Sequence, residues 1–219
     1  MKNKPVIVGI GELLWDMLPS GKKAGGAPVN FVYHASLLGA ESYAISAIGK
    51  DALGDEILQE LDKIKLSYFI ERVDYPTGTV LVQLKEGIPN YTIIENVAWD
   101  YIPATDEVKQ LARRTDAICF GTLAQRSVVS RSTIHEILSL VPQSAYRILD
   151  INIRQHFYSK QIIEESLRLC NVFKMNDDEL ELLREMFPLD GCDEEADCRW
   201  FLNHFNLKEV FLTAGAAYS

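Results

Sequence analysis

Apolar and polar positions alternate with two different periods along most of the chain. Compact apolar runs predict buried strands, and stretches in which apolar residues recur every three or four positions predict helices. The strands are predicted at residues 6–11, 43–48, 117–120, 147–151, 172–175 and 210–213. The helices are predicted at residues 28–38, 52–64, 105–113, 130–140, 160–169, 178–187 and 194–205. Because the two kinds of element alternate, the pattern predicts a three-layer α/β/α, Rossmann-like fold with a mostly parallel sheet.

Two stretches interrupt this alternation. Residues 77–94, TGTVLVQLKEGIPNYTII, hold two alternating runs around a Gly-Ile-Pro-Asn turn, which predicts an antiparallel hairpin. Residues 12–24, ELLWDMLPSGKKA, separate the first strand from the first helix. We expect the two stretches to pair into a small sheet, and a sheet too small to have its own core typically serves as a lid. The lid is predicted over about 12–24 and 77–98, within a single domain that spans 1–219.

Composition and charge narrow the function without defining it. The 219 residues are 47% apolar and 24% charged, which is typical of a globular protein, and their formal net charge is −9. Without clustered lysines and arginines, that charge argues against a nucleic-acid partner. The N-terminal sequence predicts neither a signal peptide nor a membrane partner.

The cysteines and histidines suggest no site of their own. The four cysteines form no C-x-x-C pair, so a reducing, cytoplasmic location is the simpler expectation. Cys119 and Cys170 are expected to be small buried apolar residues. The four histidines are scattered singly, which argues against a metal site built from them.

The stretch AGGAPVNF, from Ala24 to Phe31, is a first candidate for ligand contact. Gly25 and Gly26 allow close approach of the backbone to a ligand, and Asn30 lies in the first turn of the predicted helix. A glycine hinge before a helix explains the same residues. The stretch is neither a P-loop nor the G-x-G-x-x-G dinucleotide motif, because the required residues do not follow.

Asp16 is a second candidate. It stands between Trp15 and Met17, where a buried acid would be costly without partners. Two sugar hydroxyls donating to its carboxylate would satisfy it, whereas an acid in an exposed turn is the alternative.

A third group lies at the end of the strand at 147–151. Asp150, Asn152 and Arg154 occupy alternate positions there, so strand geometry predicts all three on one side. Asn176 ends the next strand and Glu179 enters the following helix, which lets both face the crevice above the sheet. Capping of that helix by Asn or Asp, with acids favoured by the helix dipole, is the alternative.

Taken in order, these motifs resemble those of the ribokinase-like, or PfkB, carbohydrate kinase family, and most closely its bacterial fructokinases. The motifs are Gly11 and Asp16, GGAPVN at 25–30, PTG at 76–78, FGTLAQR at 120–126, DINIR at 150–154 and N-x-x-E at 176–179. The resemblance implies ATP-dependent phosphorylation of a sugar hydroxyl. FGTLAQR favours fructose, while ribose, a 2-keto-3-deoxy sugar acid such as 2-keto-3-deoxygluconate and a nucleoside remain alternatives within the family.

The resemblance also implies residue roles. The sugar would contact Asp16, Gly25, Gly26, Asn30 and Arg126. Arg154 would face the transferred phosphoryl group or the sugar. The nucleotide and its phosphates would contact Asn152, Lys174, Asn176, Thr213 and Gly215. Glu179 would organise Mg²⁺, largely through water, and is expected to act on the metal rather than as a helix cap.

The implied cofactors are ATP and Mg²⁺, with a monovalent cation in a full-length protein, and a homodimer through the lid is the implied assembly. Thr213 and Gly215 match the T-x-G strand end of the family, although Tyr218 stands where Gly is common. The G-A-G-D motif, which supplies the family's catalytic Asp and anion hole, does not occur in the 219 residues. We therefore expect either a truncated kinase that is inactive alone or a non-catalytic sugar-binding or regulatory module.

Overall fold

A seven-stranded parallel sheet forms the centre of the protein. The computed structural model describes residues 4–85, 88–189, 191 and 193–215. The strand order is β11-β10-β9-β8-β1-β4-β5, and every neighbouring pair is parallel. The strands are β1 (Val6–Ile10), β4 (Glu41–Gly49), β5 (Ser67–Val73), β8 (Ala117–Phe120), β9 (Tyr146–Asp150), β10 (Val172–Asn176) and β11 (Glu209–Thr213). The predicted mostly parallel sheet is confirmed.

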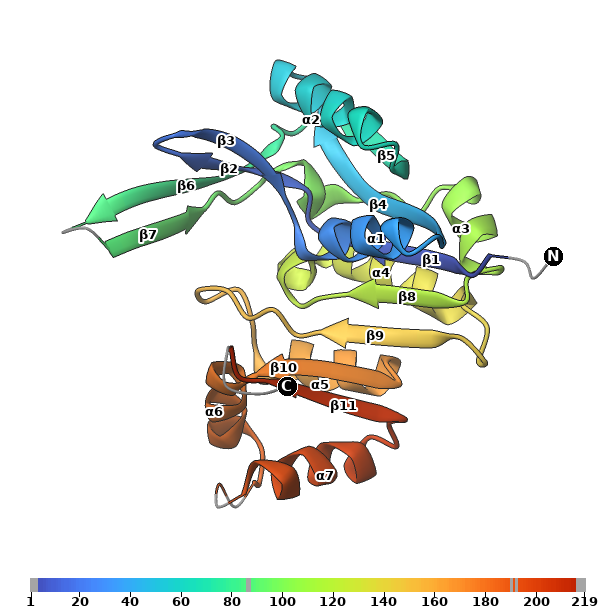
Figure 1. Cartoon of the computed structure of the whole chain (residues 1–219), viewed down its shortest axis with the longest axis vertical. Coiled ribbons are helices and arrows are strands. Elements are labelled where there is room, and N and C mark those ends of the chain that lie inside the picture. The colour runs from blue at the N-terminus through green and yellow to red at the C-terminus, as the bar shows by residue number, and fades with distance from the viewer. Residues whose placement is uncertain (1–3, 86–87, 190, 192, 216–219) are drawn as a thin grey trace.

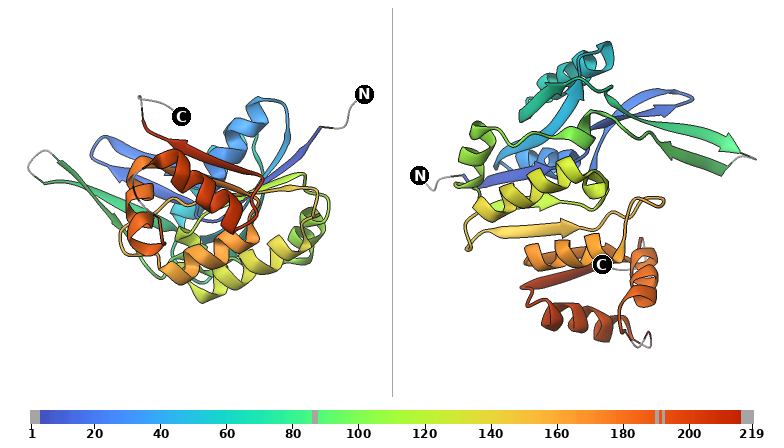
Figure 2. Two further views of the ribbon diagram at one scale, coloured as in Figure 1. Left: turned by 90° about the horizontal axis from the view of Figure 1, so that it is seen from below. Right: turned by 180° about the vertical axis from the view of Figure 1, so that it is seen from behind.

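Helices cover both faces of this sheet, which gives the three predicted layers. They are α1 (Ala27–Leu37), α2 (Ala52–Lys63), α3 (Asp106–Ala112), α4 (Val128–Leu140), α5 (Lys160–Leu169), α6 (Asp177–Met186) and α7 (Glu194–His204), with the 3₁₀ helices η1 (Ala98–Tyr101) and η2 (Leu123–Arg126). Val32 of α1 and Ile57 of α2 belong to one apolar cluster, while Ile134, Ile163 and Phe201 belong to another. Figure 1 shows α1 in front of the sheet, and Figure 2 (right) shows α4 and α5 on the opposite face.

The two interrupting stretches pair into a second, four-stranded sheet, as predicted. Its order is β3-β2-β6-β7, with β2 (Leu14–Leu18), β3 (Gly21–Gly25), β6 (Gly78–Lys85) and β7 (Ile88–Ile93). This sheet extends beyond the main one at its left in Figure 1, and we call it the lid. Asp16 lies opposite Lys23 and Val80, and Val80 lies opposite Ile93. Because paired residues share a face, these side chains all lie on one side of the lid.

The predicted Gly-Ile-Pro-Asn turn is wrong in its position. Ile88, Pro89 and Asn90 belong to β7 and pair with β6, so the connection is shorter than expected. Gly87 lies outside the described residues. A proline lacks a ladder donor, but β7 is the edge of its sheet, where Pro89 is tolerated.

The sequence pattern did not predict β5. This strand lies at the edge of the main sheet, and its residues are only partly buried or exposed, so no compact apolar run marks it. Within the described ranges, no helix is both long and apolar enough to cross a membrane.

Candidate functional site

A cavity of about 780 Å³ lies between the lid and the carboxyl ends of β1 and β9. The lid supplies Leu14, Asp16, Lys23, Ala24, Gly25, Val80, Tyr91 and Ile93. The rest of its lining is Glu12, Gly26, Ala27, Asn30, Leu123 and residues 152–155. This volume suits a small-molecule ligand, and the location beyond the carboxyl ends of parallel strands is where α/β proteins bind their ligands.

Two glycines let the backbone close tightly around this cavity. Gly26 has φ of +129°, and a Cβ there would lie 2.1 Å from the carbonyl oxygen of Glu12, so a side chain cannot be accommodated. A Cβ on Gly25 would lie 2.7 Å from Asp16 Oδ2. Pro28 lies in the first turn of α1, as predicted, and Asn30 is exposed at the cavity in that same turn.

Asp16 lies on the side of the lid that faces the cavity. It belongs to β2 and is partly buried, so it is not an acid in an exposed turn. Partial burial raises the pKa of its carboxyl, and the neighbouring charge of Lys23 offsets part of that rise. Its carboxylate makes no hydrogen bond or ion pair with any residue that the structure describes. It is therefore available to accept hydrogen bonds from a ligand.

The predicted alternation of Asp150, Asn152 and Arg154 is wrong, because β9 ends at Asp150. The chain then turns through left-handed conformations, with φ of +46° at Asn152 and +49° at Gln155. Asp150 instead pairs with Lys174 at 3.0 Å, while Asn152 and Arg154 line the cavity. Strand alternation does not explain their shared location, since the turn after β9 directs them there.

Arg154 is the one exposed cation of this turn. Its Nη1 donates a hydrogen bond of 2.8 Å to the carbonyl of Ile153, and no carboxylate in the described part of the chain pairs with it. The turn is held from two sides. Ile153 N donates to Glu179 Oε1 at 2.9 Å, and Gln155 Nε2 donates to the carbonyl of Tyr91 in β7 at 2.6 Å. The guanidinium of Arg154 is thus fixed near the cavity and open to an anion.

Glu12 is a cavity residue to which the sequence analysis gave no role. It directly follows β1 and is only 2% exposed. Its Oε1 accepts hydrogen bonds from Ala27 N at 3.0 Å and Asn152 Nδ2 at 3.3 Å, whereas its Oε2 has no partner among the described residues. Burial raises the pKa of Glu12 to about 7, despite the hydrogen bond from Ala27 and the charge of Arg154. An acid inside an apolar run at a strand end was the available signal.

Asn176 and Glu179 form a capping box at the start of α6. Glu179 N donates to Asn176 Oδ1 at 2.7 Å, and Asn176 N donates to Glu179 Oε2 at 2.9 Å. With Ile153 N on its Oε1, both oxygens of Glu179 accept backbone hydrogen bonds. The expectation that Glu179 is not a helix cap is therefore wrong, because the helix start and the turn after β9 both use it.

The other expected nucleotide contacts lie at neighbouring strand ends. Asn176 and Thr213 are paired in the register of β10 and β11, and Thr213 Oγ1 donates to the carbonyl of Met175 at 3.5 Å. Gly215 follows with φ of +53°. Lys174 is held by Asp150, as described above, and Tyr218 lies outside the described residues.

Comparison with known proteins identifies the family. The profile described as pfkB family carbohydrate kinase matches residues 20–217, which is most of the chain. The chain belongs to the pfkB family of carbohydrate kinases. Its resemblance to this family, inferred from the order of its motifs, is confirmed.

Several proteins share sequence with this pfkB chain, and the structure of one of them shares its fold. PH1459 of Pyrococcus horikoshii, described as an uncharacterized sugar kinase, is 27% identical across 80% of this chain and 63% of its own length. Its structure in complex with ATP matches with a TM-score of 0.73 over 82% of this chain and 66% of that chain. A fructokinase of Rhizobium leguminosarum bv. trifolii is 26% identical across 96% of this chain and 68% of the relative. This pfkB chain therefore spans less than two-thirds of the length of PH1459.

The structure of a fructokinase with lower sequence identity supports only the fold of this pfkB chain. A fructokinase double mutant of Vibrio cholerae, solved with fructose, ADP and a potassium ion, is 18% identical and has a TM-score of 0.80. The match covers 99% of this chain and 72% of that chain.

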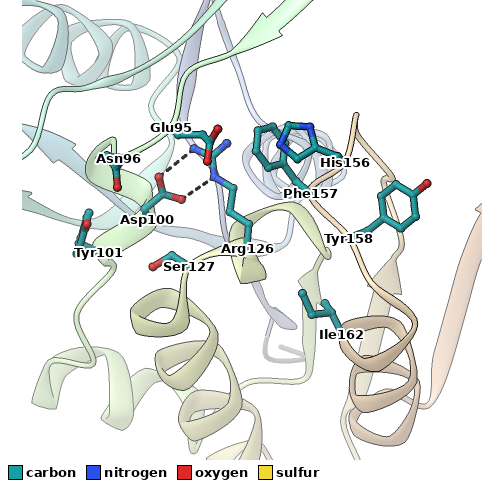
Figure 3. Close-up of a pocket in the computed structure, with 10 residues that line it drawn as sticks. All are labelled: Glu95, Asn96, Asp100, Tyr101, Arg126, Ser127, His156, Phe157, Tyr158 and Ile162. Carbon is teal, nitrogen blue, oxygen red and sulfur yellow. Dashed lines mark hydrogen bonds and ion pairs between the residues drawn. The ribbon is translucent and has the colours of Figure 1, made fainter.

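Arg126 of this pfkB chain lies in a different, smaller cavity of about 320 Å³. Figure 3 shows its guanidinium paired with Asp100, with Nε to Oδ1 at 2.8 Å and Nη2 to Oδ2 at 2.9 Å. The guanidinium carbon lies 3.9 Å from the ring centroid of Trp99 and 4.5 Å from that of Phe157. The structure thus does not bring Arg126 together with Asp16. Asp100, the carbonyl of Ile94 and the two rings hold its guanidinium, and its Nη1 has no hydrogen-bond partner among the described residues.

Proposed function

We propose that this protein binds a sugar in the cavity beneath the lid and that it provides the sugar-binding and phosphoryl-positioning parts of an ATP-dependent sugar kinase. The observation that carries the proposal is that one cavity contains an acidic and a basic side chain, each without an ion-pair partner among the described residues. The carboxylate of Asp16 and the guanidinium of Arg154 line one cavity, and neither has an oppositely charged partner in the described residues. The hydroxyls of a polyol can donate hydrogen bonds to the carboxylate of Asp16, and a phosphoryl group can bind the guanidinium of Arg154.

In this proposal each group of residues has a separate task. Asp16 accepts sugar hydroxyls, and the backbone at Gly25 and Gly26 lets the ligand approach closely, with Asn30 beside it. Val80 and Ile93 give the lid an apolar inner face, which excludes water from the reacting groups. Arg154 stabilises the negative charge of the group being transferred. Arg126 is left out of the sugar site and stabilises the fold through Asp100.

ATP and Mg²⁺ belong to the proposal as cofactors. When bound, ATP supplies the phosphoryl group and Mg²⁺ neutralises part of the phosphate charge. The strand ends that carry Asn152, Asn176 and Thr213 are the places for the nucleotide phosphates, beside the turn that follows Thr213. PH1459 has been solved in complex with ATP, which supports ATP as the proposed cofactor.

The residues fit Mg²⁺ only through its water shell. Both oxygens of Glu179 already accept a backbone N–H, and the described residues contain no group of three or more His, Cys, Asp or Glu side chains placed to hold a metal. A carboxylate oxygen has a second lone pair, so Glu179 can still accept a hydrogen bond from metal-bound water. A monovalent cation is also proposed for a full-length protein, as the resemblance to the family implies.

Fructose is the proposed sugar, because relatives named fructokinase match most of the chain. Ribose, 2-keto-3-deoxygluconate and a nucleoside are the alternatives. The family's G-A-G-D motif does not occur in these 219 residues, so we propose that they bind sugar without transferring phosphate on their own. A non-catalytic sugar-binding or regulatory module is the second candidate, favoured by that same feature.

Assembly and location complete the proposal. Leu81 of the lid pairs with Met17, on the face opposite to Asp16, and is 38% exposed. A homodimer through this face of the lid would cover it. The free thiols of Cys119, Cys170 and Cys198 fit a reducing compartment, and the buried Cys119 and Cys170 behave as predicted. We therefore place the protein in the cytoplasm.

The direct test is calorimetric titration of the chain with fructose, ribose, 2-keto-3-deoxygluconate and adenosine. We expect fructose to bind and ATP-dependent phosphorylation of fructose to be undetectable with protein purified free of host kinases. Absence of binding by all four would contradict the proposed sugar site. Robust turnover would contradict the claim that these residues do not transfer phosphate alone.

A further inference from the structure

Only one of the two carboxyl oxygens of Glu12 accepts hydrogen bonds from the described residues. Oε1 accepts Ala27 N–H, which caps α1 at a point where the N-cap residue, Gly26, has no side chain to do so. Oε1 also accepts from Asn152 Nδ2. Oε2 is buried and makes no hydrogen bond with any residue in the described ranges, although Glu12 lines the cavity.

A structural role explains the hydrogen bonds of Oε1 but does not explain the buried, unpartnered Oε2. The carbonyl oxygen of a glutamine would accept the same two hydrogen bonds as Oε1 without the cost of a buried charge. Buried polar atoms in proteins almost always have a partner, and a buried carboxylate oxygen without one is costly. An acid at this position therefore indicates a partner for Oε2 that the chain itself does not supply.

We propose that Glu12 is a further sugar-binding residue, whose Oε2 accepts a hydrogen bond from a hydroxyl group of the ligand in the cavity. The inference rests on the proposed function, because the ligand is taken to be a polyol. Glu12 and Asp16 then form two acidic contacts to one ligand, from the end of β1 and from the lid. The first contact also links the sugar to Asn152, through the hydrogen bond on Oε1.

The charges around Glu12 determine how this contact depends on pH. Arg154 favours the ionised carboxylate, Asp150 disfavours it, and the thiol of Cys119 also faces it from β8. A hydroxyl that donates to Glu12 stabilises the ionised form, so the pKa of Glu12 falls when sugar binds. Without sugar, the carboxyl of Glu12 has a pKa of about 7, so its ionised fraction rises about tenfold from pH 6 to pH 8. If only the ionised form binds sugar, the affinity for sugar rises by the same factor.

The test is calorimetric titration of the 219-residue chain with fructose at pH 6 and pH 8. The wild type should bind about tenfold more tightly at pH 8, whereas Glu12→Gln should bind weakly at both values with no pH difference. Its melting temperature should not fall, because the glutamine retains the acceptor for Ala27 N–H. Asp16→Asn is the matched control: weaker at both values, with the pH difference retained.

The outcomes separate this inference from the proposed function. Fructose binding by Glu12→Gln that equals wild type at both pH values would overturn the inference and leave the sugar site standing. Failure of the wild type to bind fructose at either pH would overturn both. Should Glu12→Gln fail to fold, the ¹³C shift of the Glu12 carboxyl in the wild type gives its pKa directly. A fall on adding fructose supports the inference, and an unchanged pKa overturns it.

Discussion

The side chain of Gln155 donates a hydrogen bond of 2.6 Å to the backbone carbonyl of Tyr91, which joins the turn after β9 to the lid. Arg154 is the neighbouring residue in that turn. This contact links the lid strand β7 to the turn that presents Arg154, whose guanidinium has no acidic partner among the described residues. We expect the position of the lid to depend on this contact, whereas the turn is also held by Glu179.

Replacing Gln155 with Ala should loosen the lid. An exposed neutral hydrogen bond contributes about 0.5 to 1.5 kcal/mol, so sugar affinity should fall roughly two- to tenfold while the melting temperature barely changes. Gln161→Ala is the control, because Gln161 makes a similar exposed hydrogen bond within α5, to Glu165. Equal affinities of the two variants, measured by calorimetry, would show that the contact to Tyr91 does not hold the lid.

Replacing Asp16 with Ala should weaken sugar binding while the fold survives. Each lost charged hydrogen bond costs about 1.5 to 3 kcal/mol, which corresponds to a roughly ten- to hundredfold higher Kd for fructose. Asp74→Ala serves as the control, since Asp74 pairs with Lys50 at the surface. Unchanged fructose affinity in Asp16→Ala would remove this residue from the site.

The buried carboxyl of Glu12 should make the stability of the protein depend on pH. Its pKa is raised from an ordinary 4.5 to about 7, so the folded state holds a proton there that the unfolded state releases between these values. Stability from this group is therefore full below pH 4.5 and declines as pH rises toward and past 7, by about 3 kcal/mol in total.

Urea unfolding at pH 5 and pH 8 measures this loss. The wild type should lose more stability over that interval than Glu12→Gln, which cannot ionise, and at pH 8 the variant should be the more stable protein. A variant that loses as much stability as the wild type would show that Glu12 titrates normally in the fold.

Arg126 should prove important for stability and not for the sugar. Breaking a buried ion pair by removing one partner typically costs about 3 to 5 kcal/mol, because the remaining charge is left without compensation. Arg126→Met should therefore destabilise the fold strongly, and adding Asp100→Asn should restore part of the loss. Fructose affinity of the folded double variant should stay near wild type, and a large loss of affinity there would return Arg126 to the sugar site.

Much of the architecture was predictable because it follows from local patterns. Compact apolar runs gave the buried strands, and Gly25, Gly26 and Pro28 marked the close turn into α1. The edge strand β5 was not predictable in this way, since partial burial leaves no compact apolar run. The turn of the lid hairpin was misplaced, because Pro89 is tolerated on an edge strand.

Candidate site residues could be named from the sequence only where a local motif marks them. Asp16 and Arg154, which both line the cavity, were named as candidates from the motifs that contain them. The proposed role of Glu12 depends on Asn152, which is 140 positions away, and on burial that only the folded chain creates. Arg126 belongs to a family motif, yet Asp100 and two aromatic rings take up its guanidinium, and no local pattern shows that.

The most direct test of the account locates the sugar by hydrogen–deuterium exchange of the chain with and without fructose. Sugar bound beneath the lid predicts slower exchange in three segments: β2, residues 25–30, and residues 152–155. The segments around the smaller cavity, at Asp100 and Arg126, should be unchanged. Slower exchange confined to that cavity, or no change anywhere at saturating fructose, would contradict the claim that the cavity lined by Asp16 and Arg154 binds the sugar.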